Sequence, residues 1–139
     1  YMSLGHPGSK LTTIEGCPNI SERADQNFKS LSLTNIELRT GDFDALLKPY
    51  LDGIPELNFA FIDGNHRKIP TTNYFELCLS KTVNDSILIF DDIHWSEEME
   101  AAWELIRNHE AVTLSVDLFQ IGLVFFRKEL SKQHFVIRF

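Results

Sequence analysis

Leu57-Asn58-Phe59-Ala60-Phe61-Ile62 is a short apolar run that stops at Asp63-Gly64. A second such run, Ser86-Ile87-Leu88-Ile89-Phe90, stops at Asp91-Asp92. Continuous apolar runs of this length, bounded by turn residues, are typical of strands buried within a parallel sheet. We therefore expect two neighbouring buried strands, each ending in acidic residues.

The rest of the chain alternates between segments of strand and helix character. This alternation predicts the α/β class, a doubly wound (Rossmann-like), mostly parallel sheet covered by helices on both faces. Two successive strands near the C-terminus have no helix between them, which predicts an antiparallel strand there. Asn19 followed by Glu22 predicts a capping box at the start of the first long helix. The further strands are expected at residues 11–15, 35–40, 112–116 and 121–127, with an ambiguous one at 135–139, and the helices at 18–31, 44–51, 71–81 and 96–108.

Composition limits the classes of partner. The chain has 139 residues, 43% of them hydrophobic, which suffices for one domain with a packed interior. Its net charge of -7 argues against nucleic acid or an anionic membrane as the main partner. No apolar run approaches the roughly 20 residues that span a bilayer. Cys17 and Cys78 are too few for a disulfide framework, so we expect two free thiols and a cytoplasmic location.

Acidic residues mark four of the expected strand ends. Glu15, Asp63 and Asp91-Asp92 directly follow apolar strands, and Asp42 follows another strand after one glycine. Ligands of open parallel sheets bind outside the carboxyl ends of the strands. We therefore expect these carboxylates to converge on one pocket.

Glu15 and Asp42 suggest a nucleoside ligand. A carboxylate after the second strand of such a sheet can accept hydrogen bonds from ribose hydroxyls. Asp42 is placed to accept from an adenine amine while Phe43 packs on the ring. The alternatives are that Glu15 is only an acid at a helix start, and that Asp42 is an N-cap.

Asp63, Asp91 and Asp92 suggest a divalent metal. Carboxylate oxygens are hard ligands, which suit Mg²⁺, Mn²⁺ or Ca²⁺. The alternative is that these acids only form a turn and a loop cap.

His66, three residues after Asp63, suggests a general base because the imidazole pKa lies near neutrality. It could equally be a surface residue or a metal ligand. His94 and Trp95 are candidates for a wall of the acceptor site, the alternative being that Trp95 is a core aromatic.

The segments Thr13-Ile14-Glu15-Gly16, Gly41-Asp42-Phe43, Phe61-Ile62-Asp63-Gly64-Asn65-His66 and Ile89-Phe90-Asp91-Asp92-Ile93 together resemble a known family. The chain is similar to class I S-adenosylmethionine-dependent methyltransferases, especially the catechol and caffeoyl-CoA type O-methyltransferases and their bacterial relatives. The resemblance covers about residues 11–127. It implies transfer of a methyl group from S-adenosylmethionine to an oxygen of a small-molecule acceptor.

The resemblance also implies roles for single residues. Glu15 would bind the ribose, and Asp42 and Phe43 the adenine of the donor. Asp63 would lie near the donor amine, take part in catalysis with His66, and bind a metal together with Asp91 and Asp92. His66 stands where the catechol enzymes carry a lysine, and Asp92 stands where the family usually has asparagine.

The family opens with a strand and a glycine-rich loop, which this sequence lacks before Leu11. Residues 1–4 fit the last turn of the first crossover helix, with Gly5 as its C-cap. We therefore expect residues 1–139 to be a single partial methyltransferase domain, its C-terminal two-thirds, that binds the donor poorly alone. Exposed strand edges would make a homodimer possible.

Other functions fit less of the pattern. A noncatalytic binding or interaction module could keep the fold without the activity. A phospho-acceptor receiver domain would carry its acidic pair at the first strand, and a nicotinamide-dependent dehydrogenase would leave Asp63 and Asp91-Asp92 unexplained.

Overall fold

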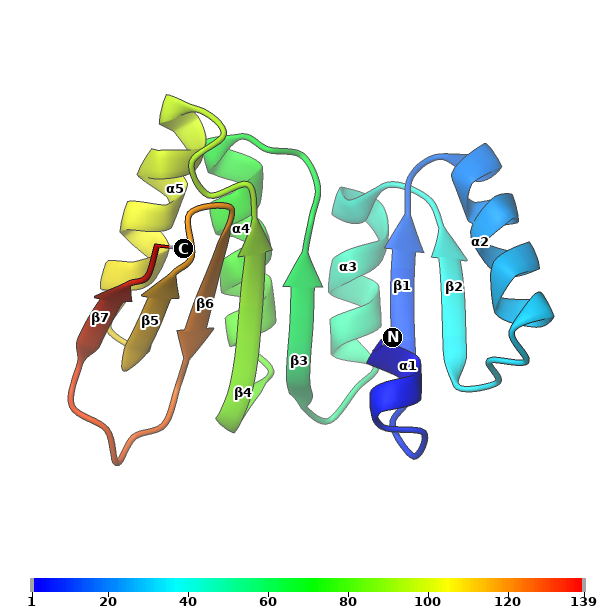
Figure 1. Cartoon of the computed structure of the whole chain (residues 1–139), viewed down its shortest axis with the longest axis horizontal. Coiled ribbons are helices and arrows are strands. Elements are labelled where there is room, and N and C mark those ends of the chain that lie inside the picture. Colours follow the sequence, from blue (N-terminus) through cyan, green and yellow to red (C-terminus); the bar gives the residue numbers. More distant parts are fainter. Residues whose placement is uncertain (1, 139) are drawn as a thin grey trace. The chain divides into compact units, whose positions relative to one another are not determined.

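The computed structural model describes residues 2–138, which form two compact units, one ending at Asp52 and the other beginning at Gly53. Tyr1 and Phe139, which the predicted first helix turn and last strand include, lie outside the described residues. The structure confirms the α/β class, with a mostly parallel arrangement of strands and an antiparallel strand near the C-terminus (Figure 1).

The first unit is a pair of parallel strands with helices. Its elements are α1 (Met2–Gly5), β1 (Leu11–Glu15), α2 (Pro18–Ser30), β2 (Ile36–Thr40) and α3 (Phe43–Asp52). Strands β1 and β2 run in register, with Glu15 opposite Thr40. Their carboxyl ends therefore lie side by side, and the Gly41 amide donates to the Glu15 carbonyl oxygen at 2.9 Å.

Helix α2 begins at Pro18, as predicted, but its capping differs from the prediction. Its N-cap is Cys17, which makes no side-chain capping bond, and Pro18 occupies the first turn. Proline suits this position because its missing N–H would have no partner within the helix. Asn19 consequently lies inside the helix, so the predicted capping box of Asn19 and Glu22 is wrong.

The second unit contains a five-stranded sheet in the order β3-β4-β6-β5-β7. Its elements are β3 (Leu57–Ile62), α4 (Lys68–Leu79), β4 (Thr82–Asp91), α5 (Glu97–Asn108), β5 (Leu114–Asp117), β6 (Ile121–Phe125) and β7 (Gln133–Val136). Strand β3 runs parallel to β4, whereas β6 runs antiparallel to both β4 and β5. The ambiguous segment near the C-terminus is a strand, β7, that begins two residues before the expected 135–139 and pairs in parallel with β5.

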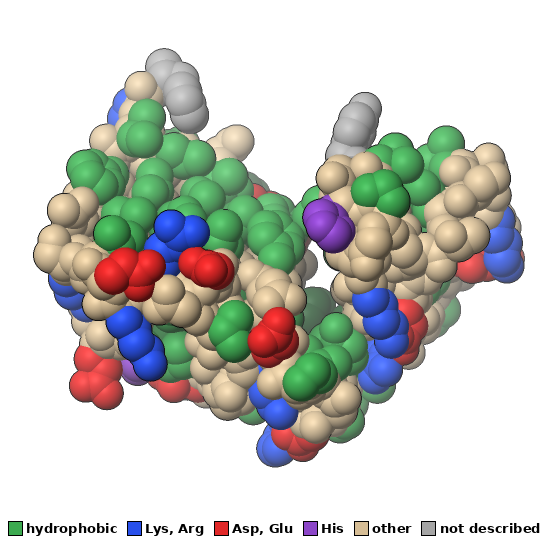
Figure 2. Space-filling model, turned by 90° about the horizontal axis from the view of Figure 1, so that it is seen from below, with side chains coloured by type: hydrophobic (Ala, Val, Ile, Leu, Met, Phe, Trp, Pro, Cys, Tyr) green, Lys and Arg blue, Asp and Glu red, His purple; other side chains and the backbone are tan. Residues whose placement is uncertain are grey.

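Helices α4 and α5 lie together on one side of this sheet (Figure 1). Ser86, Leu88 and Phe90 of β4 are all buried, and they alternate with half-buried residues that point to the opposite face. On that opposite face Phe59 and Phe61 of β3 are 40% and 42% exposed. The expectation that the whole β3 run is buried is wrong for these two residues, because an apolar sequence does not by itself supply a layer to cover it. Hydrophobic side chains accordingly gather on the surface of this unit in Figure 2.

Helix α5 follows its predicted pattern. Ser96 is the N-cap, and its side chain accepts a hydrogen bond from the Met99 amide. Three glutamates in the first turn favour the positive end of the helix dipole. The predicted apolar face, formed by Met99, Ala102, Trp103 and Ile106, is buried.

Neither cysteine forms a disulfide. Burial raises the pKa of the Cys78 thiol to about 12, so this side chain stays protonated. Across residues 2–138, none of the helices combines the length and apolarity that a membrane crossing requires.

Candidate functional site

The carboxyl ends of β3 and β4 bring three acidic residues into one region. Ile62 lies opposite Phe90 in this parallel pair, so Asp63 and Asp91 leave the sheet at the same edge. Asp92 follows directly, with a φ of 54° that turns the chain. Positive φ is uncommon outside glycine, but aspartate and asparagine tolerate it better than other residues.

His66 lies between two of these carboxylates. Its Nε2 atom is 3.4 Å from Asp63 Oδ1 and 3.6 Å from Asp92 Oδ2. This nitrogen is buried and has no hydrogen-bond partner within the described residues. The sequence placed His66 near Asp63, but only the fold brings it to Asp92.

The loop that carries His66 is held by Asn65. This residue has a φ of 53°, and its amide nitrogen donates to the Tyr74 hydroxyl at 3.2 Å. Arg67 Nε in turn donates to the Asn65 side-chain oxygen at 2.8 Å. These contacts join the residues on both sides of His66 to each other and to helix α4.

The clustering of these acids changes the pKa of Asp91. Burial raises the pKa of Asp91, and the negative charges of Asp63 and Asp92 raise it further, against smaller opposing contributions from the Asp92 amide and His66. A raised carboxyl pKa means that the ionised form is disfavoured where it stands. A nearby cation or hydrogen-bond donor would relieve this cost.

The acids do not by themselves form a ready metal centre. Among residues 2–138, no group of three or more His, Cys, Asp or Glu side chains is arranged to hold an ion. Metal binding by Asp63, Asp91 and Asp92 therefore stays a prediction.

In the first unit, Glu15 and Asp42 lie at neighbouring strand ends but already have local roles. Glu15 Oε1 accepts from the Cys17 amide at 2.8 Å. Asp42 Oδ1 accepts from the Asp44 amide at 2.8 Å, at the start of α3, whose first residue is the half-buried Phe43. Each carboxylate keeps a second oxygen, so these contacts leave room for the predicted nucleoside contacts without testing them. That Glu15 and Asp42 share one pocket with the acids of the second unit also stays a prediction.

Sequence reasoning missed Asp117, which is 4% exposed. His94 Nε2 lies 2.8 Å from Asp117 Oδ2, and an Arg138 guanidinium nitrogen lies 2.8 Å from Oδ1. The signal was present, because Asp117 directly follows the apolar run 112–116, as the other acids follow theirs. Trp95, by contrast, is 73% exposed, so the alternative of a core aromatic is wrong for it.

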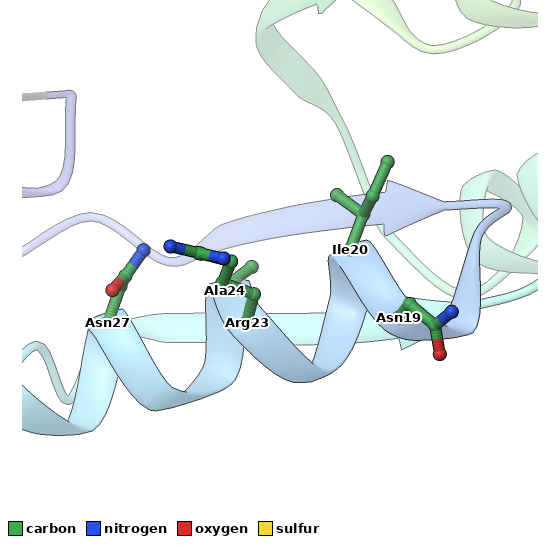
Figure 3. Close-up of a pocket in the computed structure, with 5 residues that line it drawn as sticks. All are labelled: Asn19, Ile20, Arg23, Ala24 and Asn27. Carbon is green, nitrogen blue, oxygen red and sulfur yellow. The ribbon is translucent and has the colours of Figure 1, made fainter.

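A separate depression of about 430 Å³ runs along α2. Figure 3 shows the residues that line it, which are Asn19, Ile20, Arg23, Ala24 and Asn27. They include no carboxylate, imidazole or thiol, so this surface offers no acid or base for catalysis. The strand-end residues remain the better candidate site.

Comparison with solved structures shows which proteins share this fold. An O-methyltransferase of tomaymycin synthesis from Streptomyces achromogenes, in complex with S-adenosylmethionine, is 19% identical, with a TM-score of 0.71 over 88% of this chain and 64% of that one. An O-methyltransferase from Bacillus cereus, in complex with S-adenosylhomocysteine, is 21% identical, with a TM-score of 0.68 over 85% and 63%. A Podospora anserina methyltransferase bound to S-adenosylhomocysteine is 14% identical, with a TM-score of 0.71 over 86% and 61%. The chain thus spans less than two thirds of the length of each.

Sequence comparison places the chain in a family. No curated protein sequence matches it significantly. A family described as a methyltransferase domain matches residues 2–93, which include the residues predicted to bind the donor or a metal and the predicted base His66. The chain therefore belongs to this methyltransferase domain family.

Proposed function

We propose that the protein transfers a methyl group from S-adenosylmethionine to an oxygen of a small-molecule acceptor. The observation that carries the proposal is the His66 imidazole, whose buried Nε2 lies between Asp63 and Asp92 at the carboxyl edge of the sheet and has no hydrogen-bond partner among residues 2–138. Family membership supports methyl transfer. The Streptomyces and Bacillus structures, both of O-methyltransferases with donor or product bound, favour oxygen as the acceptor atom.

His66 would act as the general base. When bound, S-adenosylmethionine supplies a sulfonium methyl group as the electrophile. His66 Nε2 would take the proton of the acceptor hydroxyl while the acceptor oxygen bonds to the methyl carbon. The transfer would leave the electrons of the carbon–sulfur bond on sulfur, and His66 would later release its proton to water. Asp63 and Asp92 would orient the ring and stabilise its positive charge.

Glu15 is proposed to bind the ribose hydroxyls, with Asp42 and Phe43 at the adenine. In the full-length protein, Glu15→Gln is expected to weaken S-adenosylhomocysteine binding about 10- to 100-fold, because hydrogen bonds to a charged acceptor are lost. Isothermal titration calorimetry measures this directly. Asp25→Asn is the matched control, since Asp25 is an acid of α2 that pairs only with Lys29 in the described structure. An unchanged affinity in Glu15→Gln would remove Glu15 from the site.

The same titration tests the proposed function as a whole. Binding of S-adenosylhomocysteine to the unmodified protein in the micromolar range supports the methyltransferase. Absence of binding would favour the alternative of a noncatalytic interaction module that retains the fold.

Asp63, Asp91 and Asp92 are also proposed to hold a divalent cation, Mg²⁺ or a similar ion. The support is the chemistry of the donors and the raised pKa of Asp91, which a cation would oppose. The side chains would have to move to form the ligand set. The proposed methyl transfer with His66 as base does not depend on the ion.

Calorimetric titration of Mn²⁺ into metal-stripped protein tests the cation site. We expect one ion per chain, and at least a tenfold loss of affinity in Asp91→Asn, because a charged ligand is lost. Asp85→Asn is the control, since Asp85 lies near the start of β4 and pairs with Arg127. Equal affinities in the two variants would exclude Asp91 as a ligand.

We also propose an acceptor class, an assembly and a cellular location for the protein. A small molecule is the proposed acceptor, and a homodimer is the proposed assembly. A cytoplasmic location is proposed from the two free thiols.

A further inference from the structure

The His94 side chain connects two acidic residues from different elements. Its Nε2 lies 2.8 Å from Asp117 Oδ2 at the end of β5, and its Nδ1 lies 3.2 Å from Glu100 Oε1 in the first turn of α5. One imidazole thus joins the β4–α5 loop to a helix and to a strand that follow it in the sequence.

Asp117 is the centre of this arrangement. Besides His94, its carboxylate accepts from the Phe119 amide at 2.8 Å and from Arg138 at 2.8 Å. Burial raises the pKa of Asp117, but the hydrogen bonds from His94, the Phe119 amide and Arg138 outweigh it and bring the pKa to about 2. The buried carboxylate is therefore ionised at neutral pH and is a strong acceptor for His94.

The His94 ring also packs on Phe119, with ring centroids 5.6 Å apart and an angle of 23° between the planes. Phe119 has a φ of 74°, an unusual conformation for a bulky residue, and the Arg138 guanidinium lies 5.5 Å from its ring. Such a conformation persists only where surrounding contacts hold it. The β5–β6 turn is thus held in one conformation, in which Phe119 packs on His94.

This arrangement lies next to the candidate site. His94 is the third residue of a turn closed by the Trp95 amide, which donates to the Asp92 carbonyl oxygen at 2.9 Å. Ile93, between them, is 1% exposed, and its amide donates to the Gln120 carbonyl oxygen at 3.2 Å. The turn therefore begins at Asp92, whose carboxylate lies beside His66.

We propose that His94 is a positioning residue, whose bridge to Asp117 and Glu100 holds the 92–95 turn so that the Asp92 carboxylate stays beside His66. The catalytic meaning of this role rests on the proposed function. The mechanical part, which is that His94 restrains the 92–95 turn, is independent of the proposed function and can be measured without an acceptor.

Hydrogen exchange of the full-length protein, followed by mass spectrometry, tests the mechanical part. In His94→Ala we expect the amides of Ile93 and Trp95 to exchange at least about tenfold faster, because charge-assisted contacts that restrain their turn are lost. Amides in the middle of β4, such as Ile89, should keep their rates. Faster exchange spread evenly over all strands would show a merely structural role, and unchanged rates at 92–95 would also overturn the proposal.

Two further variants sharpen this experiment. His109→Ala is a matched control, because His109 also packs on an aromatic ring, Phe75 at 5.2 Å, and lies 3.7 Å from a carboxylate, Glu76. It should leave the 92–95 amides unchanged. His94→Gln keeps an N–H donor that can reach Asp117, so it should restore most of the protection and serves where His94→Ala does not fold. The proposal would be contradicted if His94→Gln and His94→Ala both fold and both exchange their 92–95 amides at the rate of the unmodified protein.

A double-mutant cycle tests the catalytic part. If His94 acts through the Asp92–His66 pair, His94→Ala should lower kcat about tenfold in the natural background and not at all in a His66→Gln background. Equal losses in both backgrounds would overturn the positioning role. Failure of the proposed function is recognised separately, since the unmodified protein would then not bind S-adenosylhomocysteine, whatever the exchange rates show.

Discussion

Replacing Gly122 by alanine is expected to destabilise the protein by about 3 kcal/mol, at the upper end of the cost of overpacking a core. Gly122 lies in β6 opposite Phe90 and faces the helix layer. A Cβ atom there would lie 2.6 Å and 2.7 Å from two ring carbons of Trp103, which is only 3% exposed. A rigid indole buried between helix and sheet cannot move aside without disturbing its neighbours.

The measurement is urea unfolding of the full-length protein, with the midpoint and slope compared between variants. Gly5→Ala is the control, because a Cβ at Gly5 meets no atom within 4 Å. An unfolding midpoint in Gly122→Ala equal to that of the control would mean that the contact between β6 and α5 is looser than described.

Replacing His66 by glutamine is expected to lower kcat by about 10²- to 10⁴-fold, the usual contribution of a general base. Glutamine roughly keeps the size and polarity of the side chain but cannot accept the acceptor proton at neutral pH. The measurement is methyl transfer from radiolabelled S-adenosylmethionine to a hydroxyl acceptor that the unmodified protein turns over. Affinity for S-adenosylhomocysteine should stay within about twofold, because His66 is not among the proposed donor-binding residues.

His6→Asn is the control for this experiment, since His6 is exposed and lies in the first unit. A His66→Gln variant that retains half of the natural kcat would contradict the role of base. A variant that loses S-adenosylhomocysteine binding instead would assign His66 to the donor site.

The sequence predicted the succession of elements well because the signals are local. The runs 57–62 and 86–90, and the apolar face of 96–108, correspond closely to β3, the buried part of β4, and α5. The acidic residues directly after such runs also predicted the strand ends, where Asp63 and Asp91 lie. The start of α2 was predicted correctly, but its capping was not, because Pro18 in the first turn places the N-cap at Cys17 and not at Asn19.

Burial could not be predicted in the same way. Trp95 and Trp103 lie eight residues apart, yet one is 73% exposed and the other 3%. Trp103 faces Gly122 of a strand that follows it in the sequence, whereas Trp95 lies in a turn. Phe59 and Phe61 show the same limit, because no local pattern states whether a face of a sheet is covered.

The sequence by itself determined the α/β class, the order of helices and strands, and the placing of acids at the strand ends. These features depend on the period of the apolar pattern and on turn residues, which act over a few positions. Only the tertiary structure decided that His66 reaches Asp92, and that His94 meets Asp117, 23 residues away along the chain. Such pairs form because strand pairing and helix packing bring distant backbone segments together, and a short stretch of sequence does not specify its long-range partner.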